Sequence, residues 1–96
     1  MTTATIDEVI FRVSNEDGSV FALFPYNPAT DRYVTSYQHV GQHCAADYNG
    51  CIASSRPATP EEYADLLQEL RDREYNPRVI TRASHRRMLD AFAANL

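Results

Sequence analysis

One segment of this sequence carries both the start signals and the apolar pattern of an α-helix. Thr59 suits the N-cap position, Pro60 suits the first helical turn, and Glu62 completes a capping box with Thr59. Apolar side chains then recur at helical spacing, at Tyr63, Leu66, Leu67 and Leu70. We therefore expect a helix over residues 59–75 whose apolar face packs on another layer of the fold.

Three segments before this helix predict a β-meander. They cover residues 9–15, 20–25 and 33–40. The first alternates like a half-buried strand, and a turn with Gly18 at the positive-φ position joins it to the second. The second segment is almost continuously apolar, which predicts a central strand covered on both faces.

The chain after the helix predicts one more strand and one more helix. Asn76 and Pro77 are expected to end the first helix, since asparagine tolerates the left-handed cap and proline cannot continue the turn. Residues 78–83 alternate as a short strand, and Ser84 can cap a helix over residues 85–95. The docking face of that helix is expected to be Met88, Leu89 and Phe92.

The order β-β-β-α-β-α predicts one α+β domain over residues 1–96, with residues 1–8 as a flexible N-terminus. A right-handed crossover through the helix places the fourth strand beside the first, in a small mixed or antiparallel sheet of order 3-2-1-4. The main helix packs on one face of this sheet, and the C-terminal helix completes the fold. Residues 41–57 show no clear period, so we expect either a functional loop or a short strand over residues 50–54.

Two features of the composition exclude common nucleotide-binding and covalent mechanisms. The chain has nine arginines but no lysine, and only three scattered glycines. A Walker A motif, a Schiff-base lysine and a glycine-rich phosphate loop are therefore excluded. The N-terminus lacks the pattern of a signal peptide, and no apolar window is long enough to span a membrane. We expect a cytoplasmic protein whose two cysteines are free thiols.

Two histidines and two cysteines lie close together in the sequence, at His39, His43, Cys44 and Cys51. These are the residue types of a zinc site, but the spacing lacks a CxxC knuckle. Cys44 could also act as a nucleophile with His39 or His43 as its base and Asp47 to orient it. In the simplest interpretation the cysteines are small buried apolar residues. We expect no cofactor, and a zinc- or thiol-dependent protein using these four residues is the alternative.

Charge is unevenly distributed along the chain. The total is −4, but the first 70 residues carry −7 and the remainder carries +3. Arg86 and Arg87 fall in the first turn of the last predicted helix, where positive charge is unfavourable, so we expect them to serve binding. With Arg78, Arg82 and His85 they could grip phosphates or carboxylates. The alternative is that Arg86 pairs with Asp90 while Arg78 and Arg82 solvate one strand face.

Tyrosines are concentrated near the third predicted strand and the segment after it. Tyr26, Tyr33, Tyr37 and Tyr48 lie there, and the chain has no tryptophan. They predict either an aromatic recognition surface or cross-strand packing. Tyr48 is the better candidate for contact with a partner.

Five short stretches of the sequence carry a resemblance to a known group of proteins. They are residues 9–12, 22–25, 37–43, 46–48 and 56–65. Together they resemble a family of small, functionally uncharacterised proteins carried by bacterial phages, plasmids and conjugative elements. The resemblance implies an accessory role, and proteins of this kind include inhibitors of host defence such as anti-CRISPR proteins.

These observations predict a non-enzymatic interaction module that binds a protein partner, in the sharper form a nucleic-acid-handling protein. Direct nucleic-acid binding is opposed by a pI near 5.2. We expect no membrane partner, and either a monomer or a homodimer. The candidate binding residues are Tyr37, His39, His43, Tyr48, Arg78, Arg82, Arg86 and Arg87.

Overall fold

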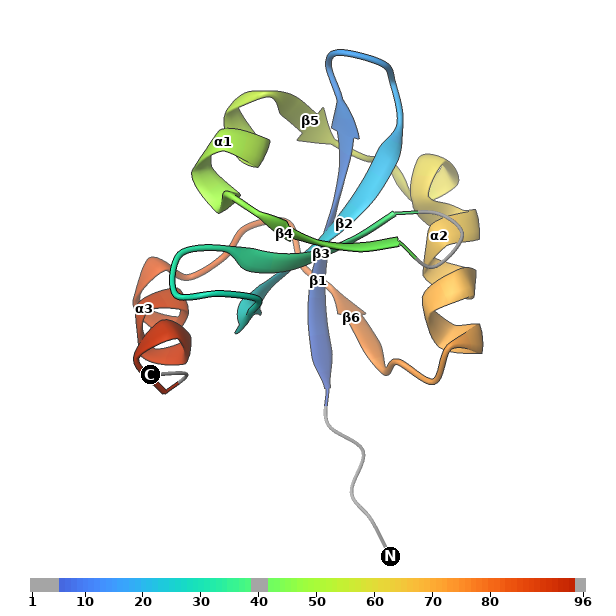
Figure 1. The fold of residues 1–96 in the computed structure, drawn as a ribbon. Coiled ribbons are helices and arrows are strands. Elements are labelled where there is room, and N and C mark those ends of the chain that lie inside the picture. The colour runs from blue at the N-terminus through green and yellow to red at the C-terminus, as the bar shows by residue number, and fades with distance from the viewer. Residues whose placement is uncertain (1–5, 39–41, 95–96) are drawn as a thin grey trace, which may run out of the picture.

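The computed structural model describes residues 6–38 and 42–94. Its six strands are β1 (Asp7–Ser14), β2 (Val20–Pro28), β3 (Val34–Gln38), β4 (Gln42–Ala46), β5 (Ser55–Pro57) and β6 (Pro77–Val79). Its three helices are α1 (Tyr48–Ala53), α2 (Pro60–Asp72) and α3 (His85–Ala94). The predicted α+β class is confirmed (Figure 1).

The strands form one sheet in the order β4-β3-β2-β1-β5. The edge of β1 that faces away from β2 pairs with two short strands, β5 and β6. Residues 12–14 pair antiparallel with β5, and residues 7–9 pair in parallel with β6. The crossover through α2 therefore returns the chain beside β1, as the sequence predicts. β1 also begins at Asp7, within the segment expected to be flexible, because the Asp7 backbone N–H donates to the Asn76 carbonyl at 2.9 Å.

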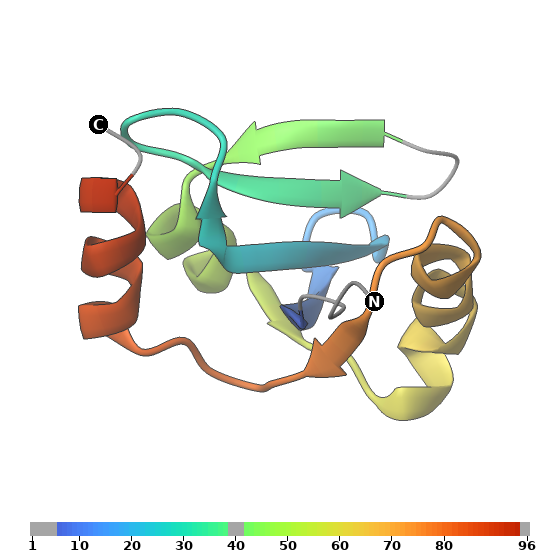
Figure 2. The ribbon, with the colours of Figure 1, turned by 90° about the horizontal axis from the view of Figure 1, so that it is seen from below.

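Helices cover both faces of the sheet, with α2 on one side and α1 and α3 on the other (Figure 2). The α2 side is a cluster of Val9, Phe11, Ala22, Phe24, Tyr37, Leu66 and Leu70. The opposite side is built on Ile10, Leu23 and Val34, against which residues from α1 and α3 pack. The expectation that β1 is half-buried is thus wrong: residues from Val9 to Val13 are all buried.

Arg12 is a charged residue within the buried, otherwise apolar part of β1. It is only 7% exposed. Its Nε donates to Ser55 Oγ at 2.9 Å, and its Nη2 donates to the carbonyls of Ser55 and Ile52 at 2.7 and 3.0 Å. The guanidinium thereby ties β1 to β5 and to the end of α1. The alternating pattern of the sequence predicts that the Arg12 side chain faces solvent. In the structure β5 and α1 cover this side chain.

The segment between β3 and α2 differs most from the sequence prediction. Residues 50–54 do not form a strand: Tyr48–Ala53 is helix α1, whose first turn has the Cys51 N–H donating to the Asp47 carbonyl at 2.9 Å. Two short strands, β4 and β5, were not predicted. The predicted last strand is also shorter, since β6 ends at Val79, and Ile80 turns toward the α3 side of the sheet.

Helix α2 has the predicted start and a different end. Thr59 Oγ1 accepts from the Glu62 N–H at 3.3 Å, and Glu62 Oε1 accepts from the Thr59 N–H at 2.9 Å, so the capping box is confirmed. The left-handed residue at the other end is Glu74, with φ 70°, and not Asn76. The reason is a Schellman arrangement in which the Tyr75 N–H donates to the Leu70 carbonyl at 3.1 Å.

Helix α3 begins at the predicted cap, because Ser84 Oγ accepts from the Arg87 N–H at 3.3 Å. Met88 is buried and Phe92 packs against the sheet. Leu89 is 53% exposed, so its predicted docking role is wrong. It lies one residue, or about 100° of helix rotation, beyond Met88 and faces away from the sheet. In the part of the chain that the structure describes, no helix has the length and apolar character needed to cross a bilayer.

The capping box gives a pH-dependent contribution to stability. Arg56 first, and then the Thr59 backbone, hold the pKa of Glu62 at about 2, below its ordinary 4.5. A lowered carboxyl pKa stabilises the fold above the ordinary value, and this contribution is lost as pH falls toward the folded value. We expect Glu62→Gln to lower the thermal midpoint at neutral pH, and the difference from wild type to shrink between pH 4.5 and about 2. A difference that stays constant across an acid series of melts would contradict this assignment.

Candidate functional site

A hollow of the described surface opens where the pairing of β1 and β2 ends. Their antiparallel pairing begins at the hairpin and extends to Ile10 opposite Leu23. Continued in this register, Glu8 would face Pro25, and proline has no N–H to donate to the ladder. β2 also bulges on its other side, where its pairing with β3 shifts between Phe24 and Pro28. The sheet therefore splays here and leaves a cleft between the two strands.

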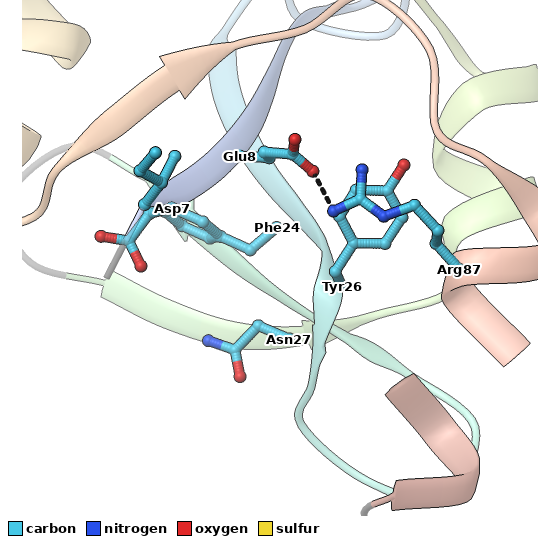
Figure 3. Close-up of a pocket in the computed structure, with 7 residues that line it drawn as sticks. Asp7, Glu8, Phe24, Tyr26, Asn27 and Arg87 are labelled. Carbon is cyan, nitrogen blue, oxygen red and sulfur yellow. Dashed lines mark ion pairs between the residues drawn. The ribbon is translucent and has the colours of Figure 1, made fainter. Parts of the chain in front are cut away.

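The cleft has a volume of about 330 Å³, at the lower end of the range for ligand pockets. Its walls come from β1, β2 and the first turn of α3 (Figure 3). Aromatic rings and charged groups both line it. The lining residues are Ile6, Asp7, Glu8, Phe24, Tyr26, Asn27 and Arg87.

Arg87 is the centre of the polar contacts in this cleft. Its Nη2 lies 2.7 Å from Glu8 Oε2, and its Cζ lies 3.9 Å from the centroid of the Tyr26 ring. Contact with Glu8 is the main cause that raises the pKa of the Arg87 guanidinium above its ordinary value. Figure 3 shows the guanidinium lying across the Tyr26 ring with Glu8 at its edge. A carboxylate and an aromatic face together are a known way to hold a guanidinium.

Tyrosine hydroxyls fix the segment that leads into α3. Tyr26 Oη accepts from the Ser84 N–H at 2.7 Å, and Tyr48 Oη accepts from the Ala83 N–H at 3.4 Å. Tyr26 therefore contributes twice to this site, through its hydroxyl to the start of α3 and through its ring to Arg87. Tyr48 is half-buried and serves the fold through this bond.

The other predicted arginines lie exposed on the same C-terminal segment. Arg78 pairs in register with Glu8, which places both side chains on the α3 side of the sheet. Arg82 and His85 are exposed in the connection to α3 and at its first residue. Arg86 forms the predicted i,i+4 pair with Asp90 at 3.8 Å, with both side chains mostly exposed, so this pair contributes little to stability. We call Arg78, Arg82 and Arg86 the arginine surface.

Of the remaining predicted binding residues, Tyr37 does not join this surface. Tyr37 is fully buried in the α2-side core, and its hydroxyl donates to the Glu69 carboxylate. This is the cross-strand packing alternative, and it leaves Tyr37 no area for contact with a partner. His39 lies outside the described residues, and so does the side chain of His43, whose backbone belongs to β4.

The two cysteines of the zinc and thiol alternative occupy different environments. Cys44 is exposed on β4, whereas Cys51 is half-buried in α1, and both are free thiols. Burial first, and then the nearby Asp47 charge, raise the pKa of the Cys51 thiol, which disfavours its thiolate at neutral pH. Among the side chains that can be placed, no three metal-ligating groups gather, and the histidines of this alternative fall outside that set.

Sequence reasoning found Arg87 and missed its partners. Glu8 falls in the segment expected to be flexible, and Tyr26 falls just after the second predicted strand. The signal that could have located the cleft is Pro25 near the end of an apolar strand, since proline interrupts pairing there. Comparison with family models, curated proteins and solved structures gives no match to this chain.

Proposed function

We propose that this protein is a non-enzymatic module that binds a protein partner through the arginine surface and the adjoining cleft. The observation that carries the proposal is the exposure of Arg78 and Arg82, which contact no carboxylate within the described residues. Exposed guanidinium groups without an intramolecular carboxylate partner are well suited to bidentate pairing with carboxylates of another protein.

The charge balance favours a protein partner over nucleic acid. The segment that carries the arginine surface is basic, but the chain as a whole has a net charge of −4. A phosphate backbone would be repelled by the acidic remainder, whereas a protein with charges of both signs can match both parts. The arginine surface is then expected to determine orientation and association rate as well as affinity.

In its sharper form, the proposal is that the partner is a nucleic-acid-handling protein of a bacterial defence system, and that binding inhibits it. The resemblance to proteins of phages, plasmids and conjugative elements supports this form. The acidic charge of residues 1–70 supports it as well, because a surface that handles nucleic acid is itself basic.

Affinity capture from a bacterial lysate tests the proposal. The bait proteins are the wild type and the variant Arg78→Ser/Arg82→Ser/Arg86→Ser, and captured proteins are quantified by mass spectrometry. We expect one dominant partner, enriched at least tenfold on the wild type over the triple variant. A captured nuclease or other nucleic-acid-handling protein supports the sharper form, and a partner of another class contradicts that form.

A matched control separates the arginine surface from the general loss of positive charge. Arg32 and Arg71 are exposed arginines on other elements, in the β2–β3 connection and in α2. The double variant Arg32→Ser/Arg71→Ser is expected to capture the same partner as the wild type. Equal capture by the wild type and the triple variant would contradict the assignment of the surface.

A further inference from the structure

We propose that the outer edge of β4 pairs with β4 of a second copy of this chain, so that two sheets join into one across a twofold axis. β4 is the terminal strand of the sheet, and no strand within the described residues pairs with its outer edge (Figure 2). The inference goes beyond the proposed function, because β4 lies at the other end of the sheet from β6, which carries Arg78.

The two ends of the sheet differ in how they are protected against strand pairing. At one end, β5 and β6 are only three residues long, and each holds a proline and an arginine. Proline, charge and short length are the usual devices that keep an edge from pairing with another chain. β4 has five residues, no proline and no charge, and it pairs with β3 without a bulge. Among the described strands, β4 is therefore the edge that is open to another strand.

Ser36 shows which backbone groups of β4 face outward. Its Oγ donates to the Cys44 carbonyl at 3.1 Å, so this carbonyl points toward β3. Backbone groups of an antiparallel strand alternate in direction from one residue to the next, so the N–H and C=O groups of His43 and Ala45 point away from β3. These groups have no backbone partner on that side within the described residues.

The outward groups favour one register for self-pairing. When Cys44 faces Cys44 of the second copy, His43 of each chain faces Ala45 of the other, and both of these pairs are hydrogen-bonded pairs. This register also overlaps the full five residues of β4. A shift of one strand by two residues would shorten the paired segment. An isologous contact needs a self-complementary surface, and this edge is one.

The charge of the chain also favours β4 as the site of self-association. Cys44 and Ala45 are exposed, small and uncharged, so neither like charge nor bulk opposes close approach there. The nearest charged residue in the sequence is Asp47. The two Asp47 residues would lie at opposite ends of the paired segment, about 20 Å apart. Because the net charge is −4, contact through most other surfaces would bring acidic groups together.

The short ladder predicts a weak dimer. Five paired residues bury much less than the roughly 1,600 Å² of a standard interface. We expect a dissociation constant of about 0.1 mM. Analytical ultracentrifugation of the full chain in reducing buffer, from about 0.01 to about 1 mM protein, should show a change from one chain to two. The mass of a single chain throughout this range would overturn the proposal.

A proline on the outer edge tests the hydrogen bonds. Ala45→Pro removes an outward N–H and leaves the hydrogen bonds to β3 in place, and proline is tolerated on an edge strand at such a position. Ala45→Ser keeps the N–H and is the matched control. We expect Ala45→Pro to weaken dimerisation at least about tenfold, and Ala45→Ser to dimerise like the wild type.

A charge at the centre of the ladder tests the same contact without a proline. Cys44→Asp would place two carboxylates opposite each other, and like charges in directly opposite positions are destabilising. Dimerisation should weaken at least about tenfold at low salt, whereas the control Cys44→Ser should dimerise like the wild type. A dimer that both Ala45→Pro and Cys44→Asp leave unchanged would use another surface and would contradict the inference.

Oxidation of Cys44 reports the register. Opposite residues of a non-hydrogen-bonded pair have Cα atoms about 4.5 Å apart, which suits a disulfide. In a Cys51→Ser background, two Cys44 thiols form one disulfide, and the oxidant diamide takes up their two electrons and two protons. The matched control, Cys44→Ser/Ala45→Cys, moves the thiol to a diagonal position about 7–8 Å from its counterpart. We expect the linked dimer to form at least about tenfold faster with Cys44.

Two further results would count against self-pairing. Equal rates of disulfide formation for Cys44 and its control would contradict the register. Hydrogen-exchange protection of the Ala45 N–H that appears only when the captured protein partner is added would assign the edge to that partner. Protection that rises with the concentration of the chain alone is the expected result.

Discussion

Replacing Arg12 by alanine is expected to lower the free energy of unfolding by about 3–5 kcal/mol. The guanidinium makes three hydrogen bonds in a buried environment, to Ser55 Oγ and to the carbonyls of Ser55 and Ile52. Truncation removes all three hydrogen bonds from a buried environment. A chain of 96 residues has a total stability of about 5–14 kcal/mol, so the loss is a large fraction of the whole. Urea unfolding followed by circular dichroism measures it.

Arg32→Ala is the control for this substitution, because Arg32 is exposed and its change should stay within about 0.5 kcal/mol of wild type. The Arg12 variant should also lose hydrogen-exchange protection first at β5 and α1, which the guanidinium joins to β1. If Arg12→Ala unfolds at the same urea concentration as Arg32→Ala, the buried role of Arg12 is refuted.

Leu70→Ala is expected to cost about 2–5 kcal/mol. Leu70 is fully buried at the last turn of α2, where it packs in the cluster that includes Phe24 and Tyr37. Its carbonyl also accepts the Tyr75 N–H that closes the helix. Removing the side chain leaves a cavity in a place where the surrounding strands cannot easily close in. The same urea series measures the change.

The matched control is Leu89→Ala, a leucine on α3 that is 53% exposed. We expect a change below about 1 kcal/mol, since little apolar area is removed from a buried position. The comparison distinguishes the two leucines that the helical pattern alone treats alike. Equal losses at Leu70 and Leu89 would contradict the exposed position of Leu89 on α3.

Local signals in the sequence predict the elements whose boundaries depend on neighbouring residues. The capping box at Thr59 and the cap at Ser84 are confirmed, since each depends on atoms within one helical turn. The hairpin with Gly18 at positive φ is confirmed for the same reason. Short elements whose stability comes from distant contacts were missed, such as β5, which pairs with β1 more than 40 residues away.

The binding site required contacts that the sequence does not display. Arg87 is identified by its unfavourable place in the first turn of a helix, but nothing local links it to Glu8 or Tyr26. Tyr37 illustrates the opposite case, in which a predicted contact residue belongs to the core. The same alternating sequence pattern is found whether an aromatic residue packs in a core or faces a partner. Only the position of α2 over that face decides between them.

The affinity of the purified captured partner tests the central claim most directly. Calorimetric titration against the wild type, the triple variant Arg78→Ser/Arg82→Ser/Arg86→Ser and the control Arg32→Ser/Arg71→Ser gives three dissociation constants. We predict a loss of at least about 100-fold for the triple variant, which corresponds to about 2.7 kcal/mol, and an unchanged value for the control. A triple variant that binds as tightly as the control would contradict the claim that the arginine surface holds the partner.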